Sequence, residues 1–192
     1  MPGTSFFKNL LPVMLSYLLL LFAALALDYL LHIGGLGWVG RYLGIPGTAL
    51  ILTSFIYSLR KRRIIRRGAP GKLLAFHEEA SWIGSVLILV HAGVHFNTLL
   101  PWLAVAAMMI VVASGHFGKY LLKNSRESLG DKKRLLMAQG IEGEELERKL
   151  FWDAVAVRLM NQWRVIHIPV VIVFATLALL HILAIFFFWN WK

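Results

Sequence analysis

The sequence predicts an all-α membrane protein, a bundle of five membrane-spanning helices. Of the 192 residues, 58% are hydrophobic and only 16% are charged, whereas soluble domains are about one quarter charged. The apolar residues form blocks close to the ~20 residues that cross ~30 Å of hydrocarbon. The basic residues cluster between alternate blocks. These three observations favour a membrane protein and exclude an intrinsically disordered chain.

Five apolar segments provide the spans. The first and the fourth have Pro12 and Pro101 near their starts, where the missing N–H of proline breaks no helical hydrogen bond. The second contains Gly44, Pro46 and Gly47 near its start, and the alternative for it is an earlier start near Trp38 with a bend at these residues. We expect one domain over residues 1–192, with spans at about residues 10–31, 43–59, 73–96, 99–122 and 165–189.

The basic residues predict the orientation of the chain. Eighteen of the 20 Lys and Arg residues lie at the N-terminus, in the loop 60–72 or in the segment 119–164. Cytoplasmic loops carry such an excess. We therefore expect a bacterial-type cytoplasmic (inner) membrane, with a cytoplasmic N-terminus and a periplasmic C-terminus. Because these loops explain the net charge of +10, we expect the lipid bilayer as a partner and no nucleic acid.

The segment between the fourth and fifth spans is long enough for a helix of its own. Residues 144–158 contain acid–base pairs four residues apart and an apolar stripe that includes Phe151 and Trp152. We expect an amphipathic cytoplasmic helix here. Its stripe suits the membrane surface, and a solvated connector is the alternative.

The absence of cysteine excludes several kinds of site. The chain contains none, so it has no thiol nucleophile, no thiolate zinc site, no cysteine-bound iron–sulfur cluster and no covalently attached haem.

Histidine spacing provides the main functional signal. Two pairs, His77 with His91 and His167 with His181, are each separated by fourteen residues within one span. Random placement of seven histidines predicts roughly 0.2 such pairs. Fourteen residues are close to four helical turns, so each pair shares one helix face, ~21 Å apart along the axis. Ionisable groups inside a membrane are costly and mark candidate functional sites.

The predicted topology brings these histidines to two levels. The third and fifth spans both run outward, so His77 matches His167 near the cytoplasm and His91 matches His181 near the outer side. Two imidazoles per level suit the axial positions of a haem iron, whereas a structural zinc site needs four converging ligands. We predict two haem b groups inside the bundle, with these four histidines as iron ligands.

Other residues are candidates for contacts with the cofactors. Gly84 lies midway between the histidines of the third span, where the helix would pass the porphyrins; ordinary helix packing is the alternative. Arg41 and Arg164 are candidates for the haem propionates. Arg41 is also the expected ion-pair partner of Asp28, because charges inside a membrane seek partners.

Two further histidines are candidates for a propionate or quinone site. His95 lies one turn after the outer ligand of the third span, and His116 lies on the fourth span. For both, a lone histidine near the membrane interface is the alternative. A quinone is therefore the second cofactor that we consider.

The histidine motifs resemble a known family. Residues 77–82 read HEEASW and are followed by VH at 90–91; residues 163–167 read WRVIH and are followed by LH at 180–181. With one span between the two helices, this pattern resembles the ferric reductase-like and NADPH oxidase-type dihaem transmembrane domain, a cytochrome b-like architecture, over about residues 10–190. The resemblance implies haem ligands on the third and fifth spans. Neither a sixth span nor a flavin domain nor a G-x-G-x-x-G motif follows, so the resemblance implies the haem relay and not a complete reductase.

We expect transmembrane electron transfer by a membrane cytochrome b subunit of a redox complex. Quinol, an iron–sulfur protein or a flavoprotein would exchange electrons with a periplasmic c-type cytochrome, and the sequence favours neither direction. We expect an oxidoreductase subunit without its own nicotinamide or flavin site. The alternatives are a histidine-containing transporter or proton channel, and a non-catalytic membrane anchor subunit.

Overall fold

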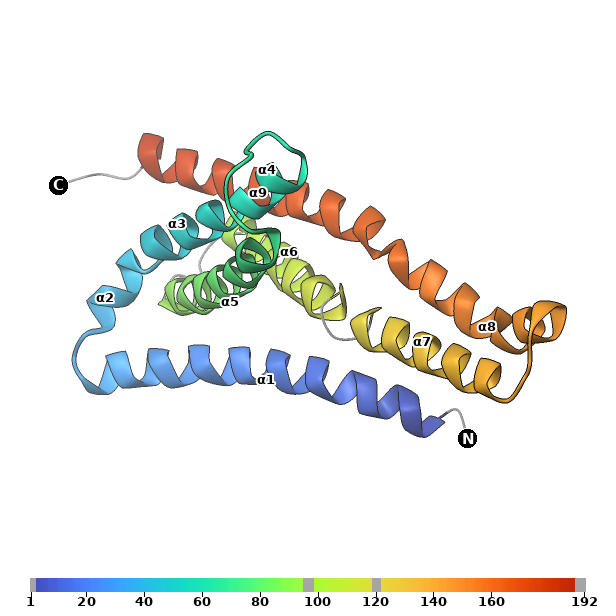
Figure 1. Ribbon diagram of the computed structural model, residues 1–192. Coiled ribbons are helices and arrows are strands. Elements are labelled where there is room, and N and C mark those ends of the chain that lie inside the picture. Colours follow the sequence, from blue (N-terminus) through green and yellow to red (C-terminus); the bar gives the residue numbers. More distant parts are fainter. Residues whose placement is uncertain (1–2, 95–98, 119–121, 189–192) are drawn as a thin grey trace. The chain divides into compact units, whose positions relative to one another are not determined.

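The computed structural model describes residues 3–94, 99–118 and 122–188, and every regular element in these ranges is a helix (Figure 1). The all-α prediction is thus confirmed for the described part of the chain. Five segments are long and apolar enough to cross a bilayer: Leu11–Ile33, Gly37–Lys61, Pro70–Gly93, Leu99–His116 and Val165–Phe188. The protein is an integral membrane protein with five candidate spans, as the sequence predicts.

The first span belongs to α1 (Gly3–Ile33), a helix of 31 residues that begins about two turns before the apolar segment. Two glycines follow its last residue. Gly35 has a φ of +68°, which glycine adopts without a steric penalty from Cβ. The N–H of Leu36 then donates to the carbonyl of Leu31 at 2.8 Å, which closes the last turn.

The second span is broken into three helices. These are α2 (Gly37–Tyr42), α3 (Gly44–Ser54) and α4 (Ile56–Lys61). At the breaks, the N–H of Leu43 donates to Gly40 and that of Phe55 to Leu52, which are tighter turns than those of an α-helix. The start at Gly37 and the first bend agree with the alternative left open by the sequence, whereas the second break was not predicted.

The remaining helices are α5 (Pro70–Val94), α6 (Leu99–His116), α7 (Leu122–Ala138), α8 (Gly143–Asn161) and α9 (Trp163–Phe188). Proline stands in the first turn of both α5 and α6, where it disturbs no helical hydrogen bond. Pro12, in contrast, lies inside α1, so the position expected for it at the start of a helix is wrong. Within the described residues the fourth candidate span covers Leu99–His116, and its predicted end near residue 122 stays a prediction.

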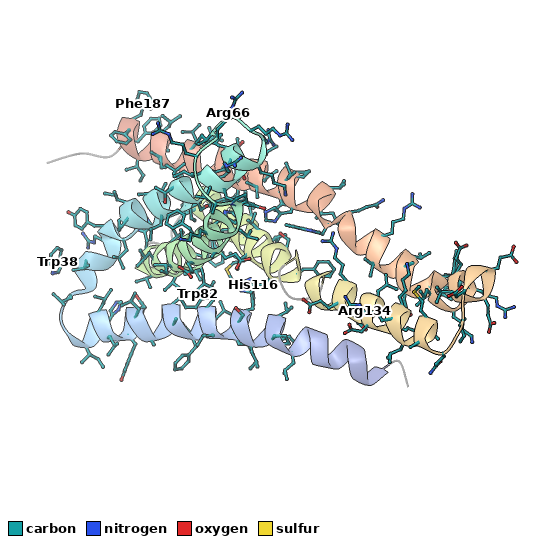
Figure 2. The ribbon with its side chains drawn as sticks, viewed as in Figure 1. Trp38, Arg66, Trp82, His116, Arg134 and Phe187 are labelled. Atoms are coloured by element: carbon teal, nitrogen blue, oxygen red, sulfur yellow. The ribbon has the colours of Figure 1, made fainter. Side chains whose placement is uncertain are left out.

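By its internal contacts the chain divides into two units, which we describe separately. The first unit comprises residues 1–16 and 113–169, and the second comprises residues 17–112 and 170–192. The core of the second unit comes from α1, α5, α6 and α9, and Trp82 packs against it (Figure 2). This core consists of Leu20, Ala24, Val86, Val90, Ala107, Met108, Val112 and Phe174.

Many large apolar side chains of the second unit lie outside its core. Phe22 and Leu25 on α1 are 69% and 70% exposed, and Phe187 on α9 is 78% exposed (Figure 2). A soluble monomer rarely exposes such surface, and in a membrane protein it faces lipid.

In the first unit, α7 and α8 lie side by side as a hairpin (Figure 1). Gly140 and Gly143, with φ values of +77° and +65°, form the turn between them. Lys132 of α7 forms an ion pair with Asp153 of α8. Helix α8 covers the predicted helix 144–158, and contact of its exposed aromatic residues with the bilayer stays a prediction.

Candidate functional site

One face of α5 carries both predicted haem ligands of the third span. His77, Gly84 and His91 recur every seven residues, so they share this face. Helix α3 packs along α5 (Figure 1), and α2 and α4 contact the same helix. The broken second span is therefore the immediate neighbour of the α5 histidines.

His77 donates a hydrogen bond to the backbone of the second span. Its Nδ1–H points to the carbonyl oxygen of Ser54, at 3.1 Å. Ser54 is only 2% exposed and is the last residue of α3, where helix carbonyls lack partners within the helix. The ring of Tyr57 packs on the imidazole, with centroids 5.6 Å apart and an angle of 32° between the planes.

His91 makes the equivalent contact at the other break. Its Nδ1–H points to the carbonyl oxygen of Gly40, at 3.3 Å, near the end of α2. Gly44 lies against the same imidazole: a Cβ at this position would be 2.8 Å from Cδ2 of His91 and 3.0 Å from its Cγ. Glycine at position 44 therefore makes the space that the ring occupies.

The second span and α5 share one antiparallel register. Gly40 and Ser54 are fourteen residues apart, as are the two histidines that contact them. Three contacts at intervals of seven residues define the register: Gly40 with His91, Gly47 with Gly84, and Ser54 with His77. A repeat of seven residues keeps one seam of contact between two long helices.

At the middle of this register the backbones of the two helices lie close together. A Cβ at Gly84 would lie 2.9 Å from the carbonyl oxygen of Gly47, and a Cβ at Gly47 would lie 3.0 Å from that of Gly84. These contacts are with backbone atoms, which cannot rotate away. Gly84 thus allows close packing of two helices, which is the alternative named for it in the sequence. A position of Gly84 beside a porphyrin stays a prediction.

The hydrogen bonds determine which imidazole nitrogen can bind a metal. A carbonyl oxygen only accepts, so the neutral rings of His77 and His91 carry their proton on Nδ1 and their lone pair on Nε2. Metal-bound histidines typically donate the other ring N–H to a carbonyl or carboxylate, which fixes the tautomer and the ring orientation. Both residues therefore share one feature of an Nε2 ligand, an Nδ1–H held by a carbonyl oxygen. The imidazole of His91 also packs on the second span through Nε2, which would lie 3.0 Å from a Cβ at Gly44.

His167, in the first unit, is held by two side chains. The hydroxyl of Ser114 lies 2.6 Å from its Nδ1 and is able to accept the Nδ1–H. Trp163 packs on the imidazole edge to face, with centroids 4.8 Å apart. Gly118 accommodates this indole, because a Cβ there would lie 2.8 Å from Trp163 Cζ2.

His116 belongs to a different contact. Its Nε2 lies 2.7 Å from the hydroxyl of Ser16, which joins the end of α6 to α1 (Figure 2). Both groups are partly buried. The contact gives His116 a structural neighbour, and a role in quinone or propionate binding stays a prediction.

For the other predicted site residues the structure gives burial or a single neighbour. His181 is partly buried on α9, and Arg41 is exposed near the end of α2. Asp28 lies beside His32, one turn along α1, with 3.5 Å between Oδ1 and Nδ1. His95 and the side chain of Arg164 lie outside the described residues.

The described residues contain no cluster of three or more His, Asp and Glu side chains able to hold a metal ion. A haem iron takes two axial ligands from the protein, so it does not need such a cluster. The pairing of the α5 histidines with those of α9 stays a prediction from the sequence.

Several residues that contact these histidines were not predicted as their partners. Ser54, Gly40 and Gly44 restrain the α5 imidazoles, while Ser114 and Trp163 restrain His167. The fourteen-residue spacing of Gly40 and Ser54 repeats that of the histidines and is visible in the sequence. Comparison with protein families, with curated proteins and with solved structures found no match.

Proposed function

We propose that this protein transfers electrons across a membrane through two b-type haems, each held by two histidines. His77 and His167 would bind the haem nearer the cytoplasm, and His91 and His181 the outer one. Bound haem supplies the one-electron chemistry, and the chain supplies ligation, orientation and a path through the bilayer.

The observation that carries this proposal is the paired restraint of the α5 histidines. Two imidazoles, fourteen residues apart on one helix face, each donate Nδ1–H to a carbonyl at a break in the second span. The donor set therefore fits two metals at two levels, with Nε2 as the ligating atom at each. Neutral imidazole also suits iron.

The surrounding residues have distinct positioning roles in this proposal. The carbonyls of Ser54 and Gly40, together with the hydroxyl of Ser114, orient three of the four imidazoles. Two histidines per haem would occupy both protein-ligand positions of the iron, which would favour electron transfer over binding of oxygen. Arg41 and Arg164 remain the candidates for the propionates.

The electron donor and acceptor would be other redox components. We propose a membrane cytochrome b subunit in a bacterial-type inner membrane, with its N-terminus in the cytoplasm. A quinone near His95 or His116, or a flavoprotein or iron–sulfur protein, would exchange electrons on one side. A c-type cytochrome would do so on the other.

The broken second span favours one competing function, a transporter. Discontinuous helices within the membrane commonly form ion or substrate sites. Here, however, a carbonyl at each break accepts a hydrogen bond from a histidine of α5, so the breaks have partners within the protein. A folded protein that moves protons but contains no haem would favour the transporter.

Liposomes test the proposed function directly. The protein is reconstituted around trapped ferricyanide, and dithionite is added outside. We expect protein-dependent bleaching of the ferricyanide, which His77→Ala or His181→Ala should abolish, because each removes a ligand from one step of the relay. His32→Ala is the matched control and should retain the rate. Equal bleaching with and without the wild-type protein would contradict electron transfer.

Ser114→Ala tests the restraint on His167. Removal of the hydroxyl leaves Nδ1 without its acceptor, and loss of such a partner typically weakens metal binding by about 10–100-fold. We expect a lower affinity for haem at one of the two sites when haem is titrated into the apoprotein. Ser114→Thr retains the hydroxyl and should restore binding. Unchanged affinity in the alanine variant would remove Ser114 from the site.

A further inference from the structure

A cationic pocket lies where the second span ends and the third begins. It has a volume of about 250 Å³ and is lined by Tyr57, Arg60, Lys61, Arg63 and Pro70. Three of the five lining residues are basic, and none is acidic. The volume is below the 300–1,000 Å³ typical of pockets for drug-sized ligands, so the pocket suits a small anion or one end of a larger ligand.

The loop that forms this pocket is held in a defined shape. Arg60 donates from Nε to the carbonyl of Gly68 at 3.2 Å, which closes the loop between α4 and α5. Lys61 lies over the ring of Tyr57, with 5.7 Å from Nζ to the centroid. The lining cations are therefore gathered by the local structure.

Arg63 adds an independent reason to infer a ligand. It has a φ of +60°, a conformation that costs an L-residue roughly 1–2 kcal/mol. The other residue of this loop with a positive φ is a glycine, Gly68. Strained residues of this kind concentrate at binding sites. The left-handed backbone at Arg63 therefore makes this arginine a candidate ligand-binding residue of the pocket.

The position of the pocket identifies the source of the anion. Lys61 is the last residue of the second candidate span, and Pro70 is the first residue of the third. The pocket therefore lies at the end of two candidate spans, the place where a bilayer around them would present its phospholipid headgroups. Arginine and lysine both bind phosphate oxygens there through charge-assisted hydrogen bonds.

We propose that this pocket binds the phosphate of an anionic phospholipid headgroup. Arg63 and Lys61 would contact the phosphate, while Arg60 holds the loop closed. Free inorganic phosphate has the same chemistry, and the bilayer is favoured over it because both spans end at the pocket. This inference does not depend on haem.

The test compares two variants with the same net charge. The pocket variant, Lys61→Gln with Arg63→Gln, removes two lining cations; the loop variant, Arg66→Gln with Arg67→Gln, removes two cations of the same loop that do not line the pocket. Delipidated protein is titrated with phosphatidylglycerol, with phosphatidylcholine and with inorganic phosphate. High salt is used because it screens the diffuse attraction of exposed charges.

We expect wild-type protein and the loop variant to prefer phosphatidylglycerol to phosphatidylcholine and to inorganic phosphate. The pocket variant should bind phosphatidylglycerol about tenfold more weakly than the loop variant, which corresponds to about 1.4 kcal/mol. Equal losses in both variants would overturn the proposal, because diffuse charge would then explain the binding. Tight binding of inorganic phosphate without preference for phosphatidylglycerol would also overturn it.

Arg63→Gly separates loss of the ligand from loss of the fold. Glycine tolerates a φ of +60°, so this variant should unfold at the same or a higher temperature than the wild type without lipid. It should also lose its preference for phosphatidylglycerol. Retained preference in this well-folded variant would contradict a role for Arg63.

Discussion

Replacing His77 with alanine is expected to remove one haem and to leave the other in place. The variant loses the imidazole whose Nδ1–H is held by the Ser54 carbonyl, and with it one of the two proposed ligands of that haem. His167→Ala should remove the same haem, because the predicted topology puts these two residues at one level of the membrane. His91→Ala and His181→Ala should both remove the other haem. The measurement is the reduced-minus-oxidised spectrum with haem quantitation for each variant.

His32→Ala is the control for these four histidine variants. His32 lies beside Asp28 on α1 and has no predicted ligand role, so His32→Ala should keep both haems. If His77→Ala and His181→Ala share one phenotype, and His91→Ala and His167→Ala share the other, the predicted topology is wrong. Retention of both haems in all four ligand variants would exclude these histidines as ligands.

Gly84→Leu is expected to reduce occupancy of both haems together. Even the Cβ of the new residue would lie 2.9 Å from the carbonyl oxygen of Gly47. Because that atom belongs to the backbone, α3 must move away from α5, and overpacking of this kind typically costs about 1–3 kcal/mol. The movement would take the carbonyls at the breaks away from His77 and His91. Thermal unfolding and haem content measure the two effects.

Gly93→Leu is the matched control for this substitution. Gly93 is on the same helix, and a Cβ there would meet nothing within 4 Å, so stability and haem content should stay normal. Gly47→Leu should reproduce the Gly84→Leu result from the opposite helix. Normal haem content and normal stability of the Gly84→Leu protein would show that close packing of α3 on α5 is not needed for haem binding.

The spans could be predicted because long apolar segments cross a membrane only as helices or closed barrels. The first bend of the second span could be predicted as well, since Gly44 and Gly47 interrupt its start. The second break, at Phe55, carries no glycine or proline signal of its own. The sequence signal near this break is a spacing: Ser54 follows Gly40 by fourteen residues, which is also the spacing of the two α5 histidines that they contact.

The partners of the histidines were harder to predict than the histidines. Two of these partners are backbone carbonyls, which every residue has, so residue type gives no signal for them. From sequence position alone, Ser114 is indistinguishable from a small residue that packs between membrane helices. In the same way, Trp163 is indistinguishable from a tryptophan of the interfacial aromatic belt. The partner of Asp28 was also hard to predict. The sequence favours Arg41 as its ion-pair partner, whereas in the structure Asp28 lies beside His32, one turn away on the same helix.

Haem content of the purified wild-type protein, combined with electron paramagnetic resonance, is the most decisive measurement. Two ligand levels with two imidazoles each predict two haem b groups per chain, both low-spin and neither binding carbon monoxide readily. A folded, colourless protein would contradict the proposed function. One haem per chain, or a high-spin iron open to carbon monoxide, would contradict the ligand set of His77, His91, His167 and His181.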